Sequence, residues 1–355
     1  MKKLALILAV LLLFGGVAFA SDVTVSGAVA HSFGFDDGYY ASGRNRANMD
    51  VNAQVDAVNS LSITFEYNDL GNRDTTDEDE ENTDGNQPVI NNAHFTTNLG
   101  AALGLDGQTL TTRIGWYEAA GYAVGNVSGV ADIERVRRAG RSQNIQLDYA
   151  FGSVVRVRTV LQPGEGDAMR GLVAVAGGFG PVQAEFVYTD IGKTATDDGQ
   201  VEVGLLYSDN VVPGTLSLRV GANFAYRLDA TGTTKETVWG VGVHAGLLDG
   251  LASLGVAFNG DDDEAVRELG IRAIVTPVDF AGLDFFVSLD LVDNDGPLSY
   301  LETSVFLKPG AATYRVGYAM QGDTEGAIGG DRNAAGSFRG EKGKGNIFFA
   351  ASLSY

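Results

Sequence analysis

Side chains that usually carry catalysis are scarce in this 355-residue chain. It contains no Cys, so neither a thiolate metal site nor a disulfide framework can form. Its three histidines are His31, His94 and His244, and none has a Ser or Asp partner at strand spacing. Lipases and proteases need such a Ser–His or Asp–His constellation. We therefore expect no enzymatic activity, no resident cofactor and no metal centre.

Acidic residues dominate the charged side chains, with 45 Asp and Glu against 25 Lys and Arg and a formal charge of −20. Phosphate binding needs a basic face, so a nucleic-acid partner is not expected. Two acidic runs, 77–81 and 261–264, lack the spaced ligands and the glycine of a dedicated calcium loop. We expect them to be solvated, charged loops.

The first twenty residues have the layout of a secretory signal peptide. Lys2 and Lys3 precede the apolar run Leu4–Val17, and Ala18-Phe19-Ala20 supplies a small-x-small cleavage pattern. A buried N-terminal helix or a membrane anchor is the alternative. We predict a cleaved signal over 1–20, export by a bacterium, and a single domain over 21–355.

The rest of the chain alternates apolar and polar residues with a period of two. In 44–57, for example, Arg and Asn occupy one set of alternate positions, while Ala, Met and Val occupy the other. Successive side chains of a strand point to opposite faces, so such a segment has one apolar and one polar side. The i, i+3, i+4 spacing of apolar residues that is typical of helices is nearly absent. The pattern therefore predicts an all-β protein.

Eighteen strands follow from this alternation, most of them close to the ~9–11 residues that cross a bilayer at a tilt. They are expected near 23–35, 44–57, 61–69, 89–99, 108–117, 143–151, 154–161, 170–177, 181–189, 200–208, 215–226, 237–247, 251–258, 265–275, 283–291, 298–307, 312–320 and 344–355. The patterns at 143–151, 154–161 and 170–177 are the weakest, so sixteen strands remain an alternative.

The connections between these strands alternate in length. Those after even-numbered strands are short (58–60, 152–153, 248–250, 308–310), and those after odd-numbered strands are long (70–88, 118–142, 190–199, 227–236, 321–343). Short turns on one rim and long loops on the other are typical of an outer-membrane barrel. We therefore predict a transmembrane, antiparallel, up-and-down β-barrel with short periplasmic turns and long extracellular loops.

Aromatic residues support this architecture, because they gather at strand ends as rings do at membrane interfaces. The expected belts comprise Phe35, Tyr67, Trp116, Tyr188, Tyr226, Phe258 and Tyr318 beside the long loops, and Tyr149, Phe151, Tyr207 and Tyr355 beside the short turns. The aromatics assigned to the inner face are few and form no run: Tyr117, Phe179, Phe286 and Phe306.

As an architecture, the whole mature chain resembles the bacterial outer-membrane general diffusion porins. Its most motif-like part is the last strand, where Ile347, Phe349, Ala351, Leu353 and the terminal Tyr355 alternate. By resemblance, Phe349, Leu353 and Tyr355 form the signal for the barrel-assembly machinery, although Phe is the commoner last residue in that family. The resemblance also implies a homotrimer in the outer-membrane lipid of a Gram-negative bacterium.

Many charged residues are expected to point into the barrel: Arg44, Arg46, Asp50, Glu66, Arg113, Asp148, Arg156, Arg158, Glu185, Glu202, Arg219, Glu268, Arg272, Asp284, Asp290 and Arg315. A barrel of sixteen or eighteen strands is too wide for side chains to fill, so its interior should hold water. For most of these residues taken singly, a solvated wall position without a selective role is the simplest interpretation.

One group of these charged residues predicts a constriction of the channel. Arg44, Arg46, Arg113, Arg156 and Arg158 are expected on the wall, and Glu118, Asp132 and Glu134 lie in the long connection 118–142. By resemblance to porins, the connection after the fifth strand folds into the barrel, and its acids face the wall arginines. An ordinary surface loop is the alternative, since several other connections are as long.

The resulting prediction is an outer-membrane porin, a water-filled channel for passive diffusion of small hydrophilic solutes and ions. The acidic balance predicts a weak preference for cations, unless the arginines control the narrowest point. Two alternatives remain: a substrate-specific channel and a non-conducting, adhesive surface barrel.

Overall fold

The computed structural model describes the chain in twelve stretches. They are 22–36, 39–69, 89–105, 108–127, 141–152, 154–163, 169–190, 199–228, 237–261, 268–291, 298–321 and 345–354. The predicted signal peptide, the acidic run 77–81, Asp132, Glu134 and Tyr355 therefore lie outside the described residues.

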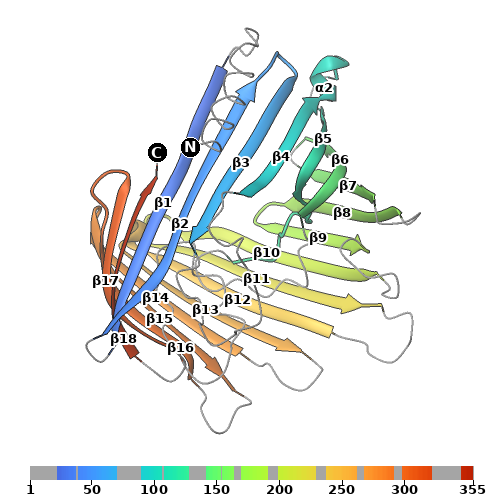
Figure 1. Cartoon of the computed structure of the whole chain (residues 1–355). Coiled ribbons are helices and arrows are strands. Elements are labelled where there is room, and N and C mark those ends of the chain that lie inside the picture. The colour runs from blue at the N-terminus through green and yellow to red at the C-terminus, as the bar shows by residue number, and fades with distance from the viewer. Residues whose placement is uncertain are drawn as a thin grey trace, which may run out of the picture.

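Eighteen antiparallel strands form one closed sheet, in which each strand pairs with its neighbours in sequence and β18 pairs with β1. Figure 1 shows this sheet curving around until the red β18 meets the blue β1. The strands are β1 Asp22–Asp36, β2 Tyr39–Gln54, β3 Asn59–Asp69, β4 Val89–Asn98, β5 Gln108–Glu118, β6 Arg141–Phe151, β7 Val155–Pro163, β8 Met169–Phe179, β9 Val182–Thr189, β10 Gln200–Val212, β11 Leu216–Arg227, β12 Thr237–Leu247, β13 Ala252–Asp261, β14 Glu268–Val278, β15 Ala281–Asp290, β16 Leu298–Leu307, β17 Ala312–Gln321 and β18 Gly345–Ser354. Each of the eighteen expected strands corresponds to one of these, which confirms the all-β barrel and selects eighteen strands over sixteen.

The two faces of the sheet differ as the alternation predicts. On β6, Ile145 and Leu147 are exposed on the outer face, while Asn144 and Gln146 are almost completely buried on the inner face. The other strands also expose Val, Leu and Phe on the outside, while the inside carries buried polar side chains together with buried apolar ones, as on β8 with Leu172, Ala174 and Ala176. An exposed apolar exterior over a polar interior is the arrangement that a lipid environment requires of a barrel.

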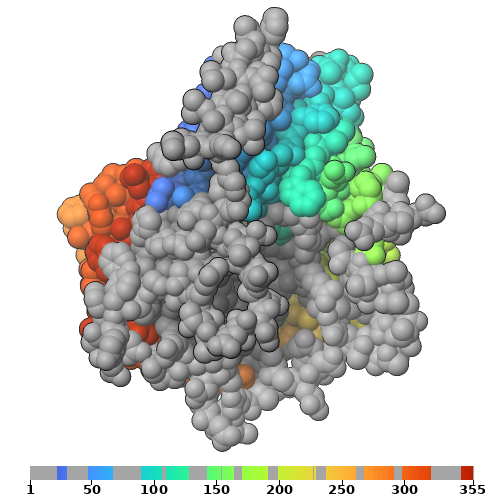
Figure 2. All heavy atoms as spheres, in the orientation of Figure 1, coloured from blue at the N-terminus to red at the C-terminus, as the bar shows by residue number. Residues whose placement is uncertain are grey.

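The outer surface is continuous from strand to strand. Figure 2 shows the atoms of the strands from blue through teal to green packed side by side over one face. Trp116, Tyr188 and Tyr318 are exposed on the outside near the ends of odd-numbered strands, as the aromatic belts predict. No helix among the described residues is both long and apolar enough to cross a membrane.

The connections follow the expected alternation with three differences. The β2–β3 turn lies at 55–58 rather than 58–60, because Asp56 accepts hydrogen bonds at 2.8 Å from the backbone amides of Val58 and Asn59. With the side-chain hydrogen bond from Asn59 as the main cause, these bonds lower the pKa of Asp56. A single helical turn, α2 (Leu99–Ala102), occupies the β4–β5 connection.

The third difference concerns the rim with the long loops. β1 ends at Asp36 and β2 begins at Tyr39, five residues before the expected start, because the two strands stay paired up to Asp36 and Tyr39. The β7–β8 connection is also short, since it spans only 164–168. Loop length therefore follows strand parity for most connections on this rim, but not for all.

Candidate functional site

The chain after β5 turns inward and lies on the wall of the barrel. We call residues 119–127 the inner segment. Its anchor is Glu185 of β9, a buried inner-face carboxylate that accepts hydrogen bonds from the backbone amides of Tyr122 and Val124, the latter at 2.8 Å. Hydrogen bonds to an ionised acceptor contribute more than neutral ones, about 1.5–3 kcal/mol each. Glu185 therefore fixes the path of the inner segment.

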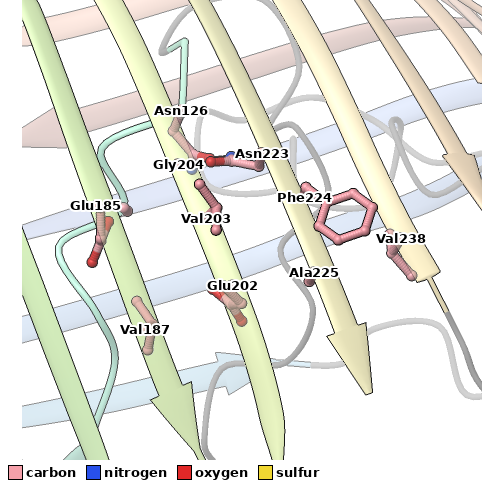
Figure 3. A pocket seen from close by; sticks show the side chains of 11 residues that line it. Asn126, Glu185, Val187, Glu202, Val203, Gly204, Asn223, Phe224, Ala225 and Val238 are labelled. Atoms are coloured by element: carbon pink, nitrogen blue, oxygen red, sulfur yellow. Dashed lines mark hydrogen bonds between the residues drawn. The ribbon is translucent and has the colours of Figure 1, made fainter. Parts of the chain in front are cut away.

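Close backbone contact lets the inner segment lie flat on β10 and β11. A Cβ on Gly125 would collide with the Asn223 side chain and the Ala222 carbonyl, and a Cβ on Gly204 would lie 2.9 Å from the amide nitrogen of Gly125. The side chain of Asn223 donates a hydrogen bond to the side-chain oxygen of Asn126 at 2.8 Å. Figure 3 shows this contact, with the inner segment crossing in front of the strands.

Tyr122 is the most extensively held side chain of the inner segment. Its ring contacts two arginines of β7, with the guanidinium carbons of Arg156 and Arg158 at 4.6 and 4.5 Å from the ring centroid. Its hydroxyl is 3.4 Å from the Oδ1 of Asp148. Burial, together with the nearby Asp148, raises the pKa of Tyr122 to about 12, against the opposing effect of the two arginines. The ring therefore stays neutral and suited to cation–π contact.

Arg158 joins the inner segment to the wall by polar contacts as well. Its Nε donates to Asp148 at 2.7 Å, and its Nη1 donates to the backbone carbonyl of Ala120 at 2.8 Å. One guanidinium thus binds a wall carboxylate, a loop carbonyl and an aromatic face at once. The planar fork of Arg suits such combined contacts.

The structure brings together three of the eight residues expected at the constriction. Arg156 and Arg158 lie on β7, and Arg113 lies on β5, where its guanidinium carbon is 5.3 Å from the ring centroid of Tyr117. Arg44 and Arg46 lie on β2, but their side chains are outside the described part. The other three are Glu118, which ends β5 opposite Arg141, and the two undescribed acids, Asp132 and Glu134. The role of all eight in a constriction stays a prediction.

A second charged group lies across the interior on β14–β17. Asp284 accepts from Arg272 at 2.6 Å and from Arg315 at 3.2 Å, and Arg315 also reaches Glu302 at 3.3 Å. All four are inner-face residues, and both carboxylates are almost completely buried. The sequence placed Arg272, Asp284 and Arg315 on the inner face but did not identify Glu302.

The inner-face aromatics are more numerous and closer together than the sequence indicated. Phe286 and Phe306 are buried as expected, but Tyr300 and Phe348 are buried on the same wall, and the rings of Phe286 and Tyr300 are 6.0 Å apart. The assignment of Phe179 to the inside was wrong: it shares the outward parity of Val173 and Val175, and at the β8–β9 turn it is 91% exposed. Tyr300 and Phe348 share the parity of residues already placed inside, so a complete parity count would have found them.

Two of the three histidines have described side chains, and both lie on the inner wall. His94 packs edge-on against Tyr117 with the ring centroids 5.5 Å apart. His244 of β12 is half-buried and pairs in register with Arg219 of β11. Within the described stretches, no group of three or more His, Cys, Asp or Glu side chains is arranged to hold a metal ion.

The last strand has the alternation on which the assembly signal was based. Phe349 and Leu353 share the outward parity of β18, while Phe348 and Ala350 are buried on the inner face. β18 closes the barrel by pairing with both β1 and β17. Recognition of Phe349, Leu353 and Tyr355 by an assembly machinery stays a prediction.

Comparison with known proteins identifies the fold. No protein-family model matches the chain, and no curated protein does. Among solved structures, a double mutant of OccD1 (OprD) is similar with a TM-score of 0.57 and 9% identity, over 95% of this chain and 96% of that one. OccK11 (OpdR) of Pseudomonas aeruginosa gives 0.54 and 9% over the same shares. A mutant of the Rhodobacter blastica porin gives 0.51 and 11%, over 94% of this chain and all of that one. The chain therefore has a porin-like barrel fold.

Proposed function

We propose that this barrel is an outer-membrane channel through which small hydrophilic solutes and ions diffuse passively. The observation that carries the proposal is the difference between the two faces of the sheet: large apolar side chains are exposed outside, and the charged and amide side chains of the strands are gathered inside, among buried apolar ones. A lumen of this width and polarity holds water. The likeness of the fold to general and to substrate-specific porins supports the same class of function.

The position of the inner segment is evidence for a narrowed pore. It is held by Glu185, by the Tyr122–Arg156–Arg158 contact and by the close approach at Gly125, so this part of the chain occupies the interior at a fixed position. A segment fixed inside the barrel reduces the open cross-section next to it. We propose that the connection 118–142 forms the constriction, with Arg113, Arg156 and Arg158 on the adjoining wall.

A weak preference for cations is the proposed ion selectivity. Three wall arginines are paired with acids: Arg158 with Asp148, and Arg272 and Arg315 with Asp284. By contrast, neutral groups satisfy two wall carboxylates, because Glu185 accepts from backbone amides, and Asp50 accepts from the hydroxyl of Thr64 and the amide of Asn48. A carboxylate held by neutral donors keeps its charge effect on passing ions.

The reversal potential of a planar bilayer in a tenfold KCl gradient tests this preference. We expect a potential of the cation-selective sign, and we expect it to shrink as salt rises, because screening shortens the reach of exposed charges to about 10 Å at 0.1 M. An anion-selective sign at every salt concentration would mean that the arginines control the narrowest point instead.

A substrate-specific channel is the second candidate, and the inner aromatics favour it. Phe286 and Tyr300 lie side by side on the wall, with Phe306 and Phe348 nearby on β16 and β18. Flat apolar rings can bind the faces of sugar rings. Saturable block of KCl conductance by a sugar would support this candidate over general diffusion.

A further inference from the structure

The inner face of β1–β4, which we call the polar wall, differs from the rest of the barrel interior. These four strands are neighbours in the sheet and run from blue to teal in Figure 1. Their inward side chains are mostly hydroxyls and amides, and those that are exposed or partly exposed include Ser26, Asp50, Asn52, Ser62, Thr64 and Thr96. None of the buried apolar side chains among the described residues belongs to β1–β4. The polar wall is therefore open to water.

The inner face of β7–β18, which we call the covered wall, carries buried apolar side chains. Within the described stretches, every one of these strands except β14 has at least one, for example Leu172 on β8 and Ala257 on β13. The inner segment covers part of this surface, because Val124 and Val127 share an apolar cluster with Ala257, and Ala119 shares another with Leu172. Packing of this kind removes apolar surface from water. A water path therefore has to run along the other part of the wall.

Asp50 supplies a negative charge within the polar wall. It pairs in register with Ser26 on β1 and with Thr64 on β3. Its carboxylate accepts hydrogen bonds from the hydroxyl of Thr64 at 2.6 Å and from the side-chain amide of Asn48 at 3.3 Å. No basic side chain among the described residues forms an ion pair with it. Because neutral donors hold this carboxylate, its charge acts on ions that pass next to it.

We propose that the water-filled path of the barrel runs along the polar wall and that Asp50 favours small hydrated cations in it. Hydroxyl and amide groups can replace water contacts of a passing ion, whereas packed apolar side chains offer none. This inference deepens the proposed function, on which it rests for conduction, by assigning one part of the wall and one carboxylate to permeation.

Cysteine labelling tests the position of the path, because the chain has no cysteine of its own. Ser26→Cys and Ser62→Cys place a thiol on the polar wall with almost no change of shape. Ser288→Cys and Ser304→Cys are the matched controls on the covered wall, where the two serines are 0% and 3% exposed. A cationic methanethiosulfonate reagent should modify the first pair at least about tenfold faster than the second in the folded protein, because thiol reactivity follows access. Mass spectrometry measures the modification in detergent.

Two controls accompany the labelling. Heat-modifiable gel mobility shows whether each variant is folded, and only folded protein is compared. Complete modification of all four variants after denaturation shows that each thiol is intact.

The reversal potential in a KCl gradient tests the role of Asp50. Asp50→Asn removes the charge but keeps an oxygen that can accept from Thr64, so it should lower the ratio of K⁺ to Cl⁻ permeability by about twofold. Modification of Ser26→Cys, the register partner of Asp50, by the cationic reagent should lower the ratio as well. An anionic methanethiosulfonate reagent at the same thiol should raise it.

Equal modification rates at the four positions would overturn the path along the polar wall, even in a protein that conducts. An unchanged permeability ratio in Asp50→Asn would overturn the role of Asp50. If the thiols of the polar wall react selectively but the protein never conducts, the water path is supported and the proposed channel function fails, so the two claims can be told apart.

Discussion

Replacing Leu147 with Arg should lower the free energy of unfolding from a lipid bilayer by about 2–4 kcal/mol. Leu147 lies near the middle of β6 on the exposed outer face, between the inner residues Gln146, which is buried, and Asp148, which is partly buried. A guanidinium at this depth would sit among acyl chains without a partner. Denaturant unfolding of the protein from vesicles measures the difference.

A residue of the same outer face that lies near the membrane interface provides the control for this experiment. Val155 is also exposed on the outer face, but it is the first residue of β7, next to a short turn. The same substitution there, Val155→Arg, should cost only about 0–1 kcal/mol, because the arginine reaches the interface. Equal costs at the two positions would contradict the conclusion that the outer face of the strands contacts the hydrocarbon core of the bilayer.

Shortening the connection after β5 should raise the single-channel conductance by at least about twofold, because the narrowest cross-section governs permeation. Glu118 and Arg141 are paired across β5 and β6, so a short connection can join the two strands. Deletion of 122–137 removes the Tyr122 contact, the Glu185 hydrogen bonds and the glycine approach together, and leaves six residues between the strands.

A deletion of equal length within the connection 70–88 is the matched control for the shortened loop, and we expect it to leave the conductance unchanged. The two variants have barrels with the same strands and differ only in which long connection is shortened. An unchanged conductance after deletion of 122–137 would mean that the connection does not control the pore.

Most of the fold follows from local alternation. Period two places Leu147 outside and Gln146 inside without any knowledge of the partner strands, and turn residues mark where each run ends. The β2–β3 turn was misplaced for a physical reason: the alternation continues past Gln54, but the hydrogen bonds of Asp56 to the backbone end the strand there.

The candidate site was less predictable, since it depends on contacts between distant parts of the chain. Arg156 and Arg158 were identified by parity, but their partner Tyr122 lies 34 and 36 residues earlier, in a connection for which no strand was predicted. One sequence signal was available: 119–125 reads Ala-Ala-Gly-Tyr-Ala-Val-Gly, a run of small and apolar residues unlike a solvated loop. Such a run predicts close packing against another surface.

The pairing of charged side chains was also not predictable from the sequence. Counting acids and bases gives the sign of the whole chain, but it does not tell which arginines are neutralised. Asp284 pairs with Arg272 and Arg315 because β14, β15 and β17 curve around one part of the wall, a proximity that alternation within single strands cannot reveal.

Single-channel recording of the purified full-length protein in a planar lipid bilayer tests the central claim most directly. A water-filled barrel predicts stepwise, ohmic conductance in KCl that is proportional to salt concentration at high salt. Folded protein that inserts into the bilayer without producing current steps would contradict the channel and favour a surface barrel that only displays its loops.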